Sequence, residues 1–132
     1  MPIAIWNDNY KTGHAVVDRQ HQELFQMVNQ LHDSIVAGKG KDVLQPTLEK
    51  LARYTIQHFG TEEALMMQTH YPLLAVHRQK HQALAQKAKE IIEGYKSGKN
   101  VLTITLSQFL ADWLSHHINE DDKALIDYLH RR

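Results

Sequence analysis

Apolar residues recur at spacings of three and four along almost the whole chain, which is the period of an amphipathic α-helix. The alternation typical of β-strands is almost absent, apart from a short VLTIT run at 101–105. Three breaks rich in helix-stopping residues divide the pattern: GKGK at 38–41, QTHYP at 68–72 and GYKSGKN at 94–100. The pattern therefore predicts an all-α chain with four long helices.

Connections of roughly four to seven residues require antiparallel neighbours. We therefore expect one domain over residues 1–132, an antiparallel up-down-up-down four-helix bundle with an extended N-terminal arm and a short C-terminal helical segment.

The local signals at the helix starts are specific enough to place caps. Asp18 is the expected N-cap of the first helix and Asp42 that of the second, where Gln45 completes a capping box. Pro46 then falls in the first turn of the second helix, and Pro72 at the first position of the third.

On each predicted helix, the stripe of residues that faces the core carries polar residues where a bundle normally places aliphatic ones. A buried polar group without a partner costs a few kcal/mol, so one histidine is tolerable but five in four helices need a joint explanation. Antiparallel helices bring residues to one level when they lie equally far from the connecting loop. Reflection about the three loops places all the polar stripe residues in one slab, toward the start of the first helix: His21, His58, Glu62, His77, His81 and His117.

Composition narrows the chemistry of this slab. The chain has no cysteine, which leaves imidazole and carboxylate as metal ligands. Its 15 basic and 15 acidic residues cancel, so we expect no nucleic-acid partner. No signal peptide or membrane span is predicted, and we expect a cytoplasmic protein with no membrane partner.

The number of ligands exceeds the four of a structural zinc site and indicates two transition-metal ions. Ferritin-like di-iron proteins need Glu-x-x-His on two helices, and the chain contains no such motif. Zinc metalloproteases need His-Glu-x-x-His, whereas the corresponding stretch here is HRQKH at 77–81. Both classes are disfavoured.

Four ordered motifs resemble those of the single-domain bacterial hemerythrins. They are D-x-Q-H at 18–21, H-F-x-x-E-E at 58–63, H-x-x-x-H at 77–81 and W-L-x-x-H-I-x-x-x-D at 113–122, and Trp6 also fits. The resemblance covers essentially the whole chain. It implies a non-haem centre of two Fe ions with an oxo or hydroxo bridge. One iron would take His77, His81 and His117 and the other His21 and His58, with Glu62 and Asp122 bridging.

The resemblance also implies a function. We expect reversible dioxygen binding for carriage, storage or delivery, with one open position on the two-histidine iron and no enzymatic activity. A di-iron enzyme or sensor acting on peroxide, nitric oxide or ferrous iron is the alternative. We expect a monomer, possible delivery to an unidentified oxygen-accepting protein, and an apolar pocket formed by Leu24, Phe59, Trp113 and Ile118.

The stretch DWLSHHINEDD leaves two frames open, because His116 and Asp121 have the same spacing of five as His117 and Asp122. Helical phase, loop reflection and the family motif favour the second pair. In a regular α-helix, a spacing of five separates two side chains by about 140° around the axis, which is too far for both to meet at one metal centre. The spacing therefore predicts a kink, a π-like turn or a restart of the helix near 118–121, with Asp122 opening a short last segment.

The remaining polar residues have simpler expectations. Glu63 is expected to be a solvated neighbour of Glu62, and Tyr54 and His14 have no defined role, although either lies within reach of the site. The histidines off the stripes are expected at the surface: His14, His32, His70, His116 and His130.

Overall fold

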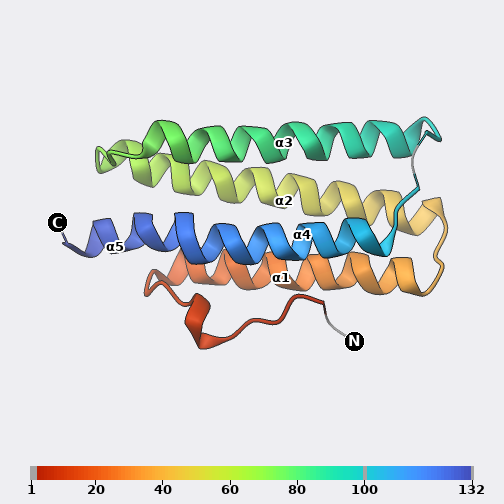
Figure 1. Cartoon of the computed structure of the whole chain (residues 1–132), viewed down its shortest axis with the longest axis horizontal. Coiled ribbons are helices and arrows are strands. Elements are labelled where there is room, and N and C mark those ends of the chain that lie inside the picture. Colours follow the sequence, from red (N-terminus) through yellow and green to blue (C-terminus); the bar gives the residue numbers. More distant parts are fainter. Residues whose placement is uncertain (1–2, 100, 132) are drawn as a thin grey trace.

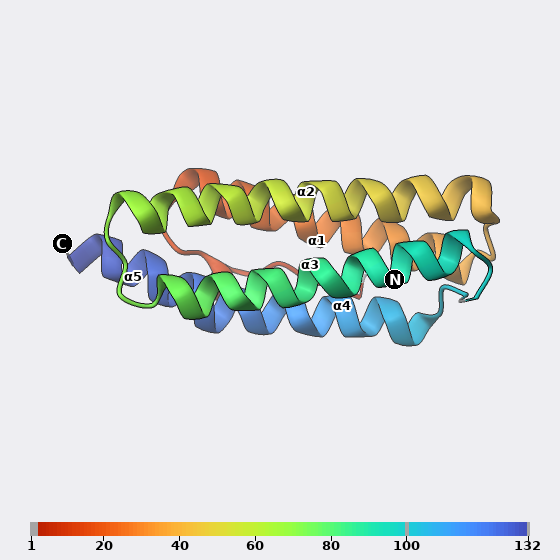
Figure 2. The same cartoon turned by 90° about the horizontal axis from the view of Figure 1, so that it is seen from above.

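The computed structural model describes residues 3–99 and 101–131, and this part of the chain contains helices and no strand. Four long helices run along one axis in two perpendicular views (Figures 1 and 2). They are α1 (Ala15–Val36), α2 (Lys41–Gln68), α3 (Leu74–Lys96) and α4 (Ile104–His117). The predicted antiparallel four-helix bundle is confirmed. No helix of the described residues is long and apolar enough to cross a membrane.

The chain remains helical after α4. A five-residue π-helical turn, η2 (Ile118–Asp122), joins α4 to α5 (Lys123–Arg131), and Figure 1 shows α4 and α5 as one continuous rod. Of the three possibilities left open by the sequence, the π-like turn is the one found. Asp122 ends this turn rather than opening the last segment, which begins at Lys123.

Three helices end in the same way. At the end of α1 the N–H of Lys39 donates to the carbonyl of Ser34, and Gly38 adopts a positive φ of 70°. Gly98 plays the same part after α3, with a φ of 82°. After α2 the left-handed residue is His70, at a φ of 54°, where a side chain costs about 1–2 kcal/mol relative to glycine.

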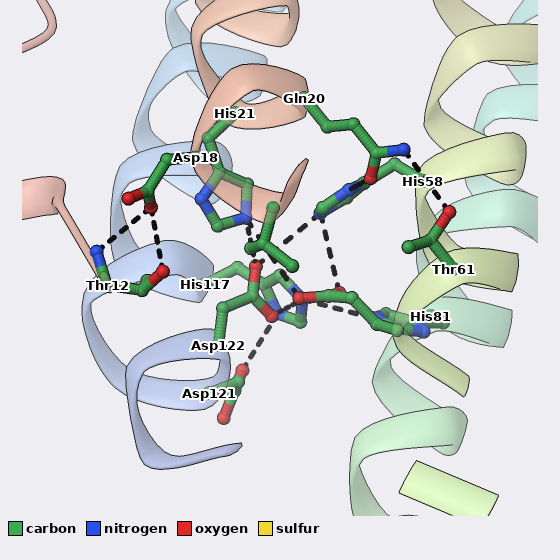
Figure 3. Close-up of polar contacts among 12 residues, drawn as sticks. Thr12, Asp18, Gln20, His21, His58, Thr61, His81, His117, Asp121 and Asp122 are labelled. Carbon is green, nitrogen blue, oxygen red and sulfur yellow. Dashed lines mark hydrogen bonds and ion pairs between the residues drawn. The ribbon is translucent and has the colours of Figure 1, made fainter. Parts of the chain in front are cut away.

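Both predicted N-caps are wrong. Helix α1 begins at Ala15, and the N-cap His14 accepts a hydrogen bond from the Val17 N–H through Nδ1. Asp18 lies one turn inside and accepts from the backbone and hydroxyl of Thr12 instead, so it holds the arm (Figure 3). Helix α2 begins after Gly40, whose extended backbone starts the helix before Asp42 is reached.

Both proline positions also differ from the prediction. Because α2 starts early, Pro46 is the sixth residue of the helix, where it removes one backbone hydrogen bond. Pro72 lies in the turn before α3, which starts at Leu74. Each of these shifts is of two residues and leaves the facing of its helix unchanged.

The predicted N-terminal arm is present and packs along α1. Asn29 binds it through three hydrogen bonds, accepting from the N–H groups of Ile3 and Ala4 and donating to the Ala4 carbonyl. The arm continues through a 3-10 turn, η1 (Asp8–Tyr10), where the Tyr10 ring lies edge-on to Phe25 at 5.1 Å.

The interior is divided into two apolar clusters. The larger one contains Leu24, Leu51, Leu114 and Ile118 with further aliphatic residues toward the α1–α2 and α3–α4 connections. The smaller one contains Met66 and Leu125 with Val17, Tyr71 and Ile126 near the opposite end. Along α1, α2 and the α4–α5 rod, the polar stripe residues fall between the two clusters. The packing thus leaves a polar layer enclosed by apolar residues on both sides.

Candidate metal centre

The structure brings the seven residues expected from the sequence into one buried cluster. Each has at most 3% of its surface exposed, and the two carboxylates have none. They come from all four long helices and the π-helical turn. The cluster, called the seven-residue cluster below, consists of His21, His58, Glu62, His77, His81, His117 and Asp122.

Ligand atoms of these residues form two overlapping groups, each with all its atoms within 4.8 Å of one another. Both groups contain Glu62 and Asp122. One adds three imidazoles, from His77, His81 and His117, and the other adds two, from His21 and His58. The two groups thus share a pair of carboxylates, and each has enough donor atoms for one metal ion.

All five imidazoles present Nε2 to the shared carboxylates, and Figure 3 shows His21 and His117 close to Asp122. Asp122 Oδ2 is 2.8 Å from His21, while its Oδ1 is 3.0 Å from both His77 and His117. Each carboxylate oxygen of Asp122 therefore faces a different site.

Glu62 occupies the other side of the centre. Its Oε1 is 3.1 Å from Nε2 of His81 and 3.5 Å from Nε2 of His58, so one oxygen lies between imidazoles of the two groups. His58 and Glu62 are one turn apart on α2, as the sequence spacing required. Glu62 is therefore placed to bridge, as Asp122 is.

Electrostatics within the cluster favour a cation between the carboxylates. Burial raises the pKa of Glu62 well above its usual value, and the facing Asp122 raises it further. Burial also works to raise the pKa of Asp122, but the charge and hydrogen bond of His117 hold it well below its usual value. Burial lowers the pKa of His81 to about 2, which keeps that imidazole neutral as a ligand must be.

Several buried polar atoms of the cluster have no hydrogen-bond partner. These are Nε2 of His58 and both oxygens of Glu62, together with Nδ1 of His21. In addition, Nε2 of His81 faces Nε2 of His117 at 3.2 Å. Buried polar groups are normally paired, and a metal ion satisfies donor atoms aimed at a common point. The residues present therefore fit a pair of first-row transition metal ions.

The outer nitrogens of three imidazoles bind residues that the sequence analysis did not place at the site. Nδ1 of His58 lies 2.6 Å from Oε1 of Gln20, and Nδ1 of His117 lies 2.9 Å from Asp121. Nδ1 of His81 lies 3.1 Å from Glu63. The expectation that Glu63 is merely solvated is wrong, because its side chain is 26% exposed and turns toward α3. Such partners orient a ligand ring.

The ambiguity in DWLSHHINEDD is resolved by burial. His117 belongs to the cluster, whereas the side chain of His116 is 71% exposed and pairs with Glu120 at the surface. Asp122 is fully buried, while Asp121 lies outside the centre and also binds Lys80 at 2.6 Å. The π-helical turn makes this possible, because it widens the helix between His117 and Asp122.

An apolar cavity of about 40 Å³ adjoins the centre, with His58, His117 and Asp122 in its wall. Since a cavity of about 10–15 Å³ holds one water molecule, this cavity accommodates a diatomic molecule. Its remaining wall is almost wholly aliphatic and aromatic: Leu24, Val28, Leu51, Thr55, Phe59, Leu84, Leu110, Trp113 and Leu114.

Three of the four expected pocket residues, Leu24, Phe59 and Trp113, line this cavity. Phe59 stacks on His81 at 3.8 Å, and Trp113 stacks on His117 at 4.5 Å, so each also fixes a ring of the cluster. Ile118 does not line the cavity. It is fully buried in the larger apolar cluster, because one residue past His117 the helix has turned away from the cavity.

The other residues of interest lie away from the cavity. Tyr54 packs against the larger apolar cluster and His14 caps α1. His32 is half-buried rather than at the surface, with Nδ1 2.7 Å from the Ser107 hydroxyl. The other off-stripe histidines are exposed as expected: His70, His116 and His130.

Fold and site together define a class, a four-helix bundle with a buried cluster of histidines and carboxylates suited to a non-haem metal centre. Residues 12–129 match the model of the hemerythrin HHE cation binding domain. The chain therefore belongs to the hemerythrin family.

Known relatives agree with this assignment. A bacteriohemerythrin of Pseudomonas aeruginosa strain PAO1 is 32% identical, over 96% of this chain and 82% of that protein. One from Methylococcus capsulatus is 29% identical, over 93% and 94% of the two chains. The crystal structure of a wild-type hemerythrin superposes with a TM-score of 0.85 at 30% identity, covering 91% of this chain and 92% of that one.

Proposed function

We propose that this chain binds dioxygen reversibly at a di-iron centre held by the seven-residue cluster. The observation that carries the proposal is the pair of overlapping ligand groups, which share Glu62 and Asp122 and adjoin an apolar cavity of diatomic size. Family membership supports it, since the hemerythrin relatives match over most of their length.

Counting donors identifies the site that stays open. Three imidazoles and two shared carboxylates provide five donors to one ion, and two imidazoles and the same carboxylates provide four to the other. For octahedral ions with one bridging oxygen, the first ion is filled and the second keeps one free position. The cavity wall contains His58 from the two-imidazole group and His117 from the three-imidazole group, so the cavity adjoins both sites, including the one that keeps a free position.

When bound, the iron pair supplies the two electrons that reversible dioxygen binding requires. The chain's own contribution is exclusion of water. Leu24, Leu51 and Leu114 are each at most 6% exposed and form part of the cavity wall, which keeps anions and bulk water from the free position. Exclusion of solvent is what protects a carrier from irreversible oxidation.

Proton supply separates a carrier from an enzyme. The described wall of the cavity contains no acid other than Asp122, which is committed to the metal centre. Its one hydroxyl, on Thr55, donates to the Leu51 carbonyl at 2.7 Å. The cavity thus lacks a side chain placed to deliver protons, which favours binding over turnover of peroxide or nitric oxide.

The test is to reduce the iron-loaded chain without air, add oxygen and follow the visible charge-transfer absorption. We expect a band that appears with oxygen and vanishes on deoxygenation through several cycles, with about two irons per chain. Rapid permanent oxidation, with turnover of added peroxide or nitric oxide, would favour the enzymatic alternative. Zinc in place of iron would overturn the proposal.

A further inference from the structure

The Nδ1 atoms of the cluster histidines have different hydrogen-bond partners at the two sites. On the three-imidazole side, His81 and His117 each bind a carboxylate through Nδ1, from Glu63 and Asp121. On the two-imidazole side, His58 binds the neutral amide of Gln20, and the buried Nδ1 of His21 has no partner. Negative charge around the ligands is thus concentrated behind one of the two sites.

Each of these carboxylates is held in place by a cation from α3. Glu63 uses Oε2 for His81 and Oε1 for Nε of Arg78, which is 3.1 Å away. Asp121 uses Oδ2 for His117 and Oδ1 for Nζ of Lys80, at 2.6 Å. The side chains of Glu63 and Asp121 are only 26% and 16% exposed, so both contacts are partly shielded from water.

A carboxylate that accepts the Nδ1 proton of a ligand imidazole makes that imidazole a stronger electron donor and fixes the ring. An amide oxygen carries less charge and does this more weakly. Stronger donation stabilises the more oxidised state of the metal. His81 and His117 are therefore stronger electron donors to the three-imidazole ion. The described contacts give no carboxylate partner to either histidine of the two-imidazole site.

We propose that Glu63 and Asp121 are positioning residues that make the three-imidazole ion the more easily oxidised member of the pair. The inference rests on the proposed di-iron function and deepens it. The ion with filled coordination holds its electron less tightly, while the two-imidazole ion keeps its free position. Arg78 and Lys80 set the orientation of the two carboxylates and moderate their charge.

The test is an anaerobic spectroelectrochemical titration of the iron-loaded full chain and its variants. Glu63→Gln and Asp121→Asn keep an acceptor on the ring but remove its charge, so we expect the midpoint potential to rise. A tenfold change in the ratio of oxidised to reduced ion corresponds to about 59 mV for one electron, and we expect a shift of that order. The converse variant, Gln20→Glu, gives His58 a carboxylate and should lower the potential.

Glu120→Gln is the matched control. It removes the same charge one residue before Asp121, from a side chain that is 60% exposed and bound only to the surface His116. Its potential should equal that of the parent chain. Equal shifts in Glu120→Gln and Asp121→Asn, or no shift in Glu63→Gln and Asp121→Asn, would overturn the inference.

The titration contains no oxygen, so it separates the two proposals. Shifts in the expected directions without reversible oxygen binding would leave the inference standing and refute the carrier function. Reversible oxygen binding with unchanged potentials would do the opposite. A chain that does not hold two irons would refute both. Circular dichroism and iron content of each variant show whether fold and loading are retained.

Discussion

Nε2 of His117 lies 3.0 Å from Oδ1 of Asp122, although the two residues are five positions apart in one continuous rod of helix. Asp121, four positions after His117, meets the opposite nitrogen of the same ring at 2.9 Å. Two consecutive carboxylates thus contact the two nitrogens of one imidazole ring. The π-helical turn is the device that separates them, since in a regular α-helix the position four residues on is the one aligned with His117.

Deleting Asn119 should convert this turn into a regular helix. Asp122 then takes the four-residue position, beside Nδ1 of His117, and no longer reaches the centre. We expect iron content to fall well below two per chain while helical content is retained, measured by metal analysis and circular dichroism. Asn119→Ala is the length-matched control at the same exposed position and should keep both irons. Full loading after the deletion would contradict this role of the turn.

Asp122→Ala should remove one shared carboxylate and with it the iron pair. Its oxygens face His21, His77 and His117, so no single other group replaces them. His116→Ala changes a side chain at the surface and should leave iron content at two per chain. Metal analysis of the purified variants provides the readout. The reverse pattern would show that the ligand frame is displaced by one residue.

The arrangement of the seven-residue cluster was accessible from the sequence because two regularities suffice to derive most of it. Helical periodicity identifies which residues face inward, and reflection about short loops places His21, His58 and His81 at one level. Asp122 was the exception, since its spacing from His117 fits no regular helix. There the family motif chose the residue, and the geometry of the turn stayed open among three possibilities.

The partners of the ligand rings could not be found in this way. Gln20, Glu63 and Asp121 each lie next to a cluster residue in the sequence, so helical phase points them off the core stripe. Gln20 and Glu63 each contact a histidine on another helix. Asp121 contacts His117, four positions earlier in the chain. Helical periodicity indicates only whether a position faces the core, and these side chains reach the core from the edge of the stripe.

Helix starts were missed for a different reason. Asp18 is a good N-cap by type, but it binds Thr12 and leaves capping to His14. Gly40 starts α2 without any side-chain cap. Cap preferences amount to about 1 kcal/mol, so the packing of the arm and the loop overrides them.

Filling the cavity should slow oxygen binding without removing iron. Leu84 is 8% exposed, lines the cavity and makes none of the cluster's contacts. Leu84→Phe should occupy the free space, at a cost of about 1–3 kcal/mol in stability from overpacking. Stopped-flow mixing of the reduced protein with oxygen measures the rate.

Leu44→Phe supplies the comparison, because Leu44 is 7% exposed in the larger apolar cluster and does not line the cavity. It should lose a similar amount of stability and keep the parent rate of oxygen binding. If both variants bind oxygen at the parent rate, the cavity is not where oxygen is held.

The metal-free chain should gain stability when the buried carboxylate of Glu62, which lacks a hydrogen-bond partner, is removed. Glu62 is fully buried, and neither of its oxygens has a hydrogen-bond partner. A buried acceptor without a partner costs about 1–3 kcal/mol, so Glu62→Met, which has a similar shape, should raise the free energy of unfolding of the metal-free protein by about that amount. Urea unfolding after chelation measures it.

The same substitution should have the opposite effect once metal is supplied. Ions that bind only the folded state stabilise it by an amount that grows with the logarithm of their affinity, and Glu62→Met removes a ligand that both sites share. Added iron should therefore raise the urea midpoint of the parent chain strongly and that of the variant little. Glu120→Met, at a surface position, should change the metal-free stability by no more than about 0.5 kcal/mol. A metal-free Glu62→Met chain less stable than its parent would mean that the carboxylate stabilises the bundle by itself, and the cluster would then be structural rather than built for metal.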